Sequence, residues 1–199
     1  MEIIDITKGI FSSPVYPGDP EPEKQNFQSI EKGDGCNLNG YFACCHAGTH
    51  ADAPLHFVED GKSIDEMSMI PFIGPCRVLD VPPGPITGEY VENSFPRGCR
   101  RLLLKSEGEA YFLDHGAQAA ANLGLLLIGT DALSVGTHGN QIAPHKAFLN
   151  KGIAILEGLD LTGVETGSYF LLAQPVKLEG MEASPVRALL IKGDFHWNS

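Results

Sequence analysis

The sequence predicts an α/β domain in which strands outnumber helices. Short apolar runs bounded by glycine and proline recur along the 199 residues, as is typical of buried strands. Two helix–strand pairs, over residues 114–128 and 144–156, favour α/β over an all-β fold. The length suits a single domain over residues 1–199, and neither a linker nor an internal repeat divides the sequence.

The expected strands are short runs rich in apolar residues. They cover Glu2–Ile6, Tyr41–Cys45, Arg77–Val81, Arg101–Leu104, Leu125–Ile128, Ile153–Leu156, Tyr169–Ala173 and Arg187–Ile191. A Gly/Pro-rich turn is expected over residues 16–20, and the polar stretch from Glu21 to Gly35 is expected to be a loop or an irregular arm.

Two helices are expected between these strands. The Ala-rich stretch Asp114–Leu123 has Asp114 as a plausible N-cap, and Gly124 ends it. The second helix, Pro144–Asn150, carries its proline in the first turn, where a missing N–H costs little. The result is a mixed sheet with few helices.

The charge balance restricts the partners. Lys and Arg number 14 against 25 Asp and Glu, which gives a net charge of −11, and we see no Lys/Arg cluster. Such a chain is a poor candidate for binding nucleic acid or an anionic membrane. A neutral or cationic small-molecule substrate, or a metal ion, suits it better.

The N-terminus and the cysteines favour a cytoplasmic protein. The first residues have neither the basic nor the apolar region of a signal peptide, and no apolar run is long enough to span a membrane. The five cysteines are an odd number without a CxxC pair, which is typical of reduced thiols.

One segment concentrates the residues that carry chemistry. His50, Asp52 and His56 follow His46 at offsets of four, six and ten. Because every offset is even, an extended chain points all four side chains one way, whereas a helix would scatter them. A glycine and a proline inside the segment also argue against a helix. We expect a bent, extended segment that presents three imidazoles and one carboxylate to one pocket.

This donor set favours a metal site. Imidazole and carboxylate are the usual ligands of Zn²⁺, Mn²⁺ and Fe²⁺, and a bound metal makes hydroxide available near neutral pH. The alternatives are a metal-free His–Asp acid–base pair, or histidines that only hydrogen-bond buried backbone. Three histidines and one aspartate within eleven residues exceed what either alternative needs.

A second candidate region lies downstream. His145 opens the second expected helix, and Glu157 follows the strand Ile153–Leu156. A carboxylate at a strand tip is costly to bury unless it is paired or binds a metal. From the pattern alone, a solvent-facing strand end is the favoured interpretation of Glu157.

The segment from His46 to His56 resembles the HxGTHxDxPxH signature of the metal-dependent cyclase-like hydrolases, a family that includes bacterial kynurenine formamidases and isatin hydrolases. The resemblance spans nearly the whole chain and implies the family's swivelling β/β/α fold, assembled as a homodimer or homotetramer. Further family-like segments follow in order at Tyr16–Asp19, Gly129–Ser134, His145 with Gly152–Gly158, and Ser184–Ala188.

The resemblance assigns roles to the clustered residues. It implies that His46, His50 and Asp52 are metal ligands, and that His56 is either a ligand of a second metal or the base that transfers the proton. The cofactor would be one or two divalent ions, Zn²⁺ or Mn²⁺.

The downstream residues acquire roles as well. His145 and Glu157 would complete the site as second-metal ligands or as partners of the hydrolytic water, and Glu157 shares the proton-transfer role with His56. Tyr16 and Phe57 are the expected substrate-binding residues.

The implied activity is hydrolysis of a C–N bond other than a peptide bond, with an aryl formamide such as N-formylkynurenine as the first substrate. The alternatives are a hydrolase or cyclase that acts on another cyclic amide or lactone, as isatin hydrolases do, and a metal-binding module without turnover. The pocket wall departs from the family, because Lys146 replaces a second histidine and Tyr16 stands where kynurenine formamidases often carry Trp.

Overall fold

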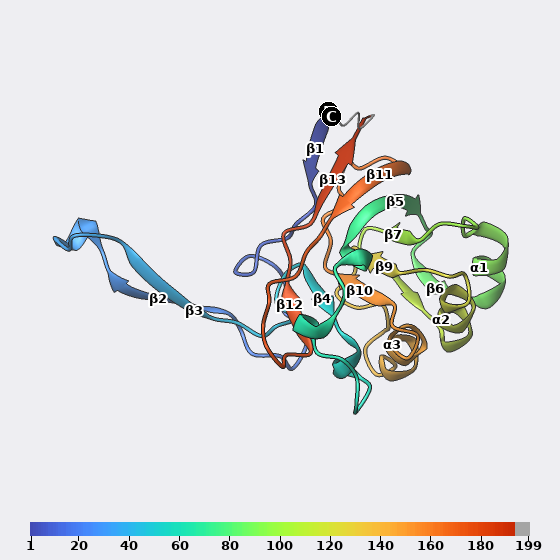
Figure 1. Ribbon diagram of the computed structural model, residues 1–199, viewed down its shortest axis with the longest axis horizontal. Helices are drawn as coiled ribbons and strands as arrows, with labels where there is room; N and C mark the ends of the chain where they lie inside the picture. The colour runs from blue at the N-terminus through green and yellow to red at the C-terminus, as the bar shows by residue number, and fades with distance from the viewer. Residues whose placement is uncertain (194–199) are drawn as a thin grey trace.

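One curled, mixed sheet organises the fold (Figure 1). The computed structural model describes residues 1–193, and its sheet has nine strands in the order β1-β13-β11-β5-β7-β9-β10-β4-β12. The four central strands β5, β7, β9 and β10 run parallel, and each outer strand is antiparallel to its neighbours. The strands are β1 (Glu2–Asp5), β4 (His50–Asp52), β5 (Ile73–Asp80), β7 (Arg101–Lys105), β9 (Leu127–Thr130), β10 (Ala154–Glu157), β11 (Gly167–Leu172), β12 (Ala183–Pro185) and β13 (Leu189–Lys192).

The central strands are buried on both faces. In β7, Leu102 and Leu104 belong to the core beneath the helices, whereas Leu103 between them belongs to the opposite core. Strand β10 alternates in the same way, with Ile155 on the helix side and Leu156 on the other. Burial on both faces explains why these strands read as continuous apolar runs in the sequence.

Three α-helices among the described residues cover one face of the sheet: α1 (Gly88–Ser94), α2 (Asp114–Ala121) and α3 (Ile142–Leu149) (Figure 1). A short parallel pair, β6 (Gly84–Ile86) and β8 (Ala110–Phe112), lies beside them. Gly116 lets α2 approach β6 closely, because a Cβ at this position would lie 2.0 Å from the carbonyl oxygen of Ile86.

The last two strands close the curl of the sheet. Strand β12 stands at one end of the strand order and β13 is second from the other end, yet only residues 186–188 separate them in sequence. The Ile6 N–H bonds the carbonyl of Ala188, and the Val186 N–H bonds that of Thr49. The two ends of the sheet are therefore brought round towards each other.

A two-stranded hairpin projects from the body (Figure 1). Strands β2 (Glu23–Gln28) and β3 (Leu38–Phe42) pair antiparallel with each other and with no other strand. We call residues 23–42 the arm; none of its residues is buried. Its exposed large apolar side chains are Phe27, Ile30, Leu38, Tyr41 and Phe42.

The α/β expectation is confirmed, and several details are corrected. The segment from Glu21 to Gly35, expected to be a loop or an irregular arm, contains the regular strand β2, because backbone pairing with β3 orders it without a buried face. Asp114 lies in the first turn of α2, and Leu113 is the N-cap. Helix α1, capped by the Thr87 hydroxyl that accepts from the Tyr90 N–H, was not expected.

Short 3₁₀ segments connect the remaining elements, at Ile30–Lys32, Pro54–His56, Ile64–Glu66 and Ile70–Phe72. Within residues 1–193, no helix has the length and apolar character that a membrane crossing requires.

Candidate metal centre

Strands β4 and β10 form the floor of the centre. His50 and Asp52 alternate on β4 and so share one face, and Glu157 of β10 is the direct cross-strand neighbour of His50. All three side chains are buried, Asp52 completely. The even spacing predicted that these side chains point the same way, and the regular strand β4 produces this for His50 and Asp52.

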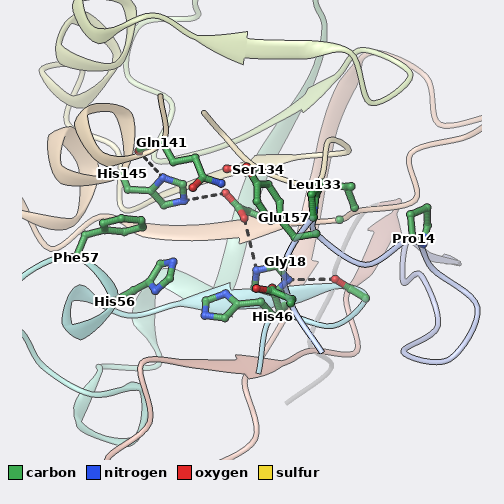
Figure 2. Close-up of a pocket in the computed structure, with 16 residues that line it drawn as sticks. Pro14, Gly18, His46, His56, Phe57, Leu133, Ser134, Gln141, His145 and Glu157 are labelled. Atoms are coloured by element: carbon green, nitrogen blue, oxygen red, sulfur yellow. Dashed lines mark hydrogen bonds and ion pairs between the residues drawn. The ribbon is translucent and has the colours of Figure 1, made fainter. Parts of the chain in front are cut away.

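His46 and His56 reach the same place from irregular backbone. His46 lies in the turn before β4, and His56 ends the 3₁₀ segment Pro54–His56, so the expected extended conformation holds only between them. The two rings lie 4.3 Å apart between centroids, and His46 Nδ1 lies 3.1 Å from Asp52 Oδ1. Figure 2 shows both rings facing His145 and Glu157 across the cavity.

Gly48 and Thr49, the Gly-Thr of the motif, hold the backbone in place. Gly48 has a φ of +68°, and a Cβ there would lie 3.0 Å from the carbonyl oxygen of Lys8. The Thr49 hydroxyl donates to the carbonyl of Gly158 and accepts from the Lys8 N–H. These contacts tie the start of β4 to the loop after β10, so the ligand-bearing strands keep a fixed relative position.

Backbone carbonyls orient two of the imidazoles. His145 on α3 places Nδ1 2.8 Å from the carbonyl oxygen of Gln141, and His50 places Nδ1 3.1 Å from that of Gly48. A proton on Nδ1 satisfies each contact and leaves Nε2 free to bind a metal. Both Nε2 atoms point towards the carboxylates of Asp52 and Glu157.

Glu157 is a buried member of the centre. Its Oε1 accepts from the Val135 N–H at 2.7 Å and lies 3.1 Å from His145 Nε2 (Figure 2). The solvent-facing strand end favoured from the pattern alone is therefore wrong, because the loop after β9 and helix α3 cover this end of β10.

The centre contains buried polar atoms that lack a hydrogen bond. Among residues 1–193, no hydrogen-bond partner reaches His50 Nε2 or either carboxylate oxygen of Asp52. Leaving such atoms unsatisfied costs roughly 1–3 kcal/mol each, and more when they are charged. A cation bound among them would remove this cost, so these residues fit a divalent metal.

The donor atoms form two groups that share Asp52. His46, Asp52 and His56 offer ligand atoms within 4.8 Å of one another, and so do His50, Asp52 and Glu157. Imidazole nitrogen and carboxylate oxygen are suitable donors for Zn²⁺ and Mn²⁺.

The charges of the buried groups are strongly coupled. Burial lowers the pKa of His50, but the carboxylates of Asp52 and Glu157 outweigh it and raise the pKa to about 10. Burial also lowers the pKa of His145, and Glu157 and Asp52 raise it to about 9. The carboxylates thus stabilise positive charge at this position, and a metal ion competes with protons for the same ligands.

His56 differs from its neighbours. Its pKa is lowered, chiefly by burial, with Asp52 opposing and the nearby imidazoles of His46 and His145 contributing. It is less buried than His50 and its ring lies beside Phe57, 4.2 Å between centroids. A neutral imidazole on the cavity wall is suited to accept a proton.

A cavity of about 330 Å³ opens above these donors (Figure 2). The aromatic side chains of Tyr16 and Phe57, expected to bind substrate, both line it, and Asp19 adds a carboxylate to the lining. Neither Lys nor Arg lines it, whereas polar groups come from Ser134 and Gln141. The cavity therefore suits a ligand with an aromatic part and a positively charged group.

Three contacts of the site were missed by sequence reasoning. Glu182 Oε1 lies 3.3 Å from His46 Nε2, because β12 pairs with β4 and places residue 182 beside the centre. Ser134 and Gln141 enter from the loop between β9 and α3. The family-like segment Gly129–Ser134 was a signal for Ser134, whereas no local pattern marked the other two.

Comparison with known proteins places the chain in a family. The sequence profile of the Cyclase family matches residues 4–137, which is more than half of the chain. The chain belongs to the cyclase family. Members named kynurenine formamidase are similar over most of their length: that of Sphingopyxis alaskensis is 37% identical over 94% of this chain and 97% of its own, and that of Salinibacter ruber is 34% identical over 96% and 97%.

Solved structures of other proteins share the fold of this chain. A protein from Bacillus stearothermophilus, described as a predicted metal-dependent hydrolase, superposes with a TM-score of 0.82 at 27% identity, over 95% of this chain and 97% of its own. Isatin hydrolase A from Labrenzia aggregata has a TM-score of 0.79 at 19% identity, over 95% and 93%. At this lower identity the likeness establishes the shared fold.

Proposed function

We propose that this cyclase-family protein is a metal-dependent hydrolase of the kynurenine formamidase type, which cleaves the aryl formamide bond of N-formylkynurenine. The observation that carries the proposal is the buried donor set around Asp52, which contains unsatisfied polar atoms and whose histidines and Glu157 line a cavity of substrate size. The 37% identity to a kynurenine formamidase over nearly the full length of both chains supports this choice of substrate.

We propose that the metal is Zn²⁺ or Mn²⁺. The two donor groups that share Asp52 support a pair of ions, with His46 and His56 on one side and His50 and Glu157 on the other. If His56 serves as the base and not as a ligand, the other donors would hold a single ion. When bound, the metal supplies an acidified water and polarises the carbonyl that the water attacks.

The cavity walls orient the substrate. Tyr16 and Phe57 offer aromatic surface for the aryl ring, and the Asp19 carboxylate offers an ion pair to the ammonium group of an amino-acid side arm. The formamide carbonyl then points inward towards the buried donors. Ser134 and Gln141 provide polar contacts on the facing wall.

His56 is best placed to transfer the proton. Its lowered pKa keeps it neutral at pH 7, so it can take a proton from the attacking water and pass it to the departing nitrogen. Glu157 is less free for this task, because the Val135 N–H already donates to its Oε1. Water adds to the formyl carbon, the C–N bond breaks, and the products are formate and the aryl amine.

The chain's cysteines and the projecting arm support two further proposals. All five cysteines are free thiols, which is consistent with a reducing, cytoplasmic location. The arm exposes five large apolar side chains on a hairpin that pairs with no other strand, although Phe11 of the body contacts Tyr41 and Lys24 at its base. An isolated two-stranded hairpin is marginal in water. We propose that the arm packs on a second copy of the chain in a homodimer or a homotetramer built from such dimers.

The substrate proposal is tested by assaying purified protein with N-formylkynurenine after the metal is stripped and then restored as Zn²⁺ or Mn²⁺. We expect metal-dependent turnover with kcat/KM above about 10⁴ M⁻¹s⁻¹. Isatin and simple lactones serve as alternative substrates in the same assay. Trace turnover of the formamide beside efficient lactam hydrolysis would contradict the formamidase assignment, and no turnover of any of them would favour a binding module.

His56→Ala separates the two roles of this histidine. We expect metal content to remain that of the wild type while kcat falls by about 10²- to 10⁴-fold, because the proton-transfer group is lost. Metal analysis by mass spectrometry accompanies the kinetics, and His115→Ala, exposed on α2, is the control. Loss of one of two bound ions in His56→Ala would contradict the base role and make His56 a ligand.

The arm is tested by replacing residues 24–41 with Asn-Gly. This dipeptide suits a tight hairpin turn between Glu23 and Phe42, which are paired with each other. We expect the mass measured by light scattering to fall to that of a smaller assembly. The point variant Phe27→Ser should weaken association, and Ile70→Ser, similarly exposed on the body, should not. An unchanged mass in the arm variant would contradict the proposal.

A further inference from the structure

Four of the five arginines of this acidic chain line one cavity. Arg77, Arg97, Arg100 and Arg101 surround a space of about 360 Å³ whose lining contains neither Asp nor Glu. The sequence suggested no basic cluster, and that expectation is wrong in three dimensions. Strands β5 and β7 pair in parallel, with Arg77 opposite Leu102, and so bring residue 77 beside residues 97–101.

Arg101 is buried without a counter-charge. Its guanidinium donates only to neutral backbone carbonyls, with Nε 2.7 Å from the carbonyl oxygen of Pro71 and the other nitrogens on Ile70 and Pro75. A Cβ on Gly74 would lie 2.8 Å from the guanidinium carbon, so the group fills the space that this glycine leaves. Burial lowers the pKa of Arg101, and the charge of Arg100 adds to the effect. An uncompensated buried cation is costly, and a nearby anion would offset that cost.

The other three arginines also lack acidic partners. Within residues 1–193, no ion pair forms at Arg77, Arg97 or Arg100, although Arg97 donates to the carbonyl of Glu92. Elsewhere on the surface, by contrast, Lys192 pairs with Glu165 and Arg187 with Asp5. A chain with 25 acidic residues thus leaves its one arginine cluster unneutralised.

The cavity is separate from the candidate metal centre. It lies where β7 begins, whereas Glu157 stands at the carboxyl end of β10, which runs parallel to β7 through β9. The two ends belong to opposite edges of the parallel sheet. None of the residues that line the metal cavity lines this one.

We propose that this arginine-lined cavity is a binding site for a small molecule that carries a phosphate group. The planar guanidinium forks of several arginines match the oxygens of a tetrahedral dianion and neutralise its two charges together. A monocarboxylate would neutralise only one charge of the cluster. The exposed hydroxyl of Ser168 on the same wall can donate to a further phosphate oxygen.

The test is calorimetric titration of the metal-loaded protein with inorganic phosphate and with glycerol phosphate at constant ionic strength. We expect saturable binding of one equivalent of at least one of them, weakened at least about tenfold in the double variant Arg77→Gln/Arg100→Gln. Both side chains are exposed, so the variant is expected to fold, and circular dichroism checks this. Tighter binding of glycerol phosphate points to an ester ligand, and tighter binding of phosphate points to the free ion.

The control is Arg187→Gln, which removes an arginine outside the cavity. Its phosphate affinity should match that of the wild type. Three results would overturn the proposal: no saturable binding of either phosphate, equal weakening in the control and the double variant, or acetate binding as tight as phosphate. Phosphate that binds at the metal centre instead would leave the double variant with wild-type affinity, which also overturns it.

Discussion

The fully buried carboxylate of Asp52 is the constraint on which the site depends. Neither of its oxygens has a hydrogen-bond partner among the described residues, so its burial is costly unless positive charge surrounds it. Imidazoles of His46, His50 and His145 approach it within 3.6 Å. The pKa of Asp52 is held well below its usual range because these contacts outweigh burial, which raises it. A divalent cation satisfies the same requirement.

The fold meets this constraint by joining distant segments at one point. Strand β4 lies between β10 and β12, so residues near 50, 157 and 183 converge on the same face. Gly158 passes so close to Gly48 that a Cβ would lie 2.6 Å from the Gly48 carbonyl oxygen. The curl of the sheet and the close approach of these two glycines therefore position the donors on the strands. Helix α3 adds His145 from the helical layer.

Sequence reasoning predicted what depends on local pattern. Continuous apolar runs identified the central strands, which are buried on both faces. The even offsets from His46 predicted that the side chains of four donors share one pocket. It failed where long-range pairing decides the outcome. Strand β2 has no buried face, so its sequence does not alternate between apolar and polar residues. Glu182 lies beside His46 only because β12 pairs with β4. Arg77 lies near Arg100 only because β5 pairs with β7. Burial of Glu157 needed the covering loop after β9, which no single strand pattern reveals.

The role of Asp52 as a metal ligand can be checked by anomalous X-ray diffraction from crystals of the zinc-loaded protein. We expect a zinc peak about 2.0–2.2 Å from an Asp52 carboxylate oxygen, with His50 Nε2 also bound. Zinc bound elsewhere on the chain, with Asp52 uncoordinated in a protein that remains active, would contradict it.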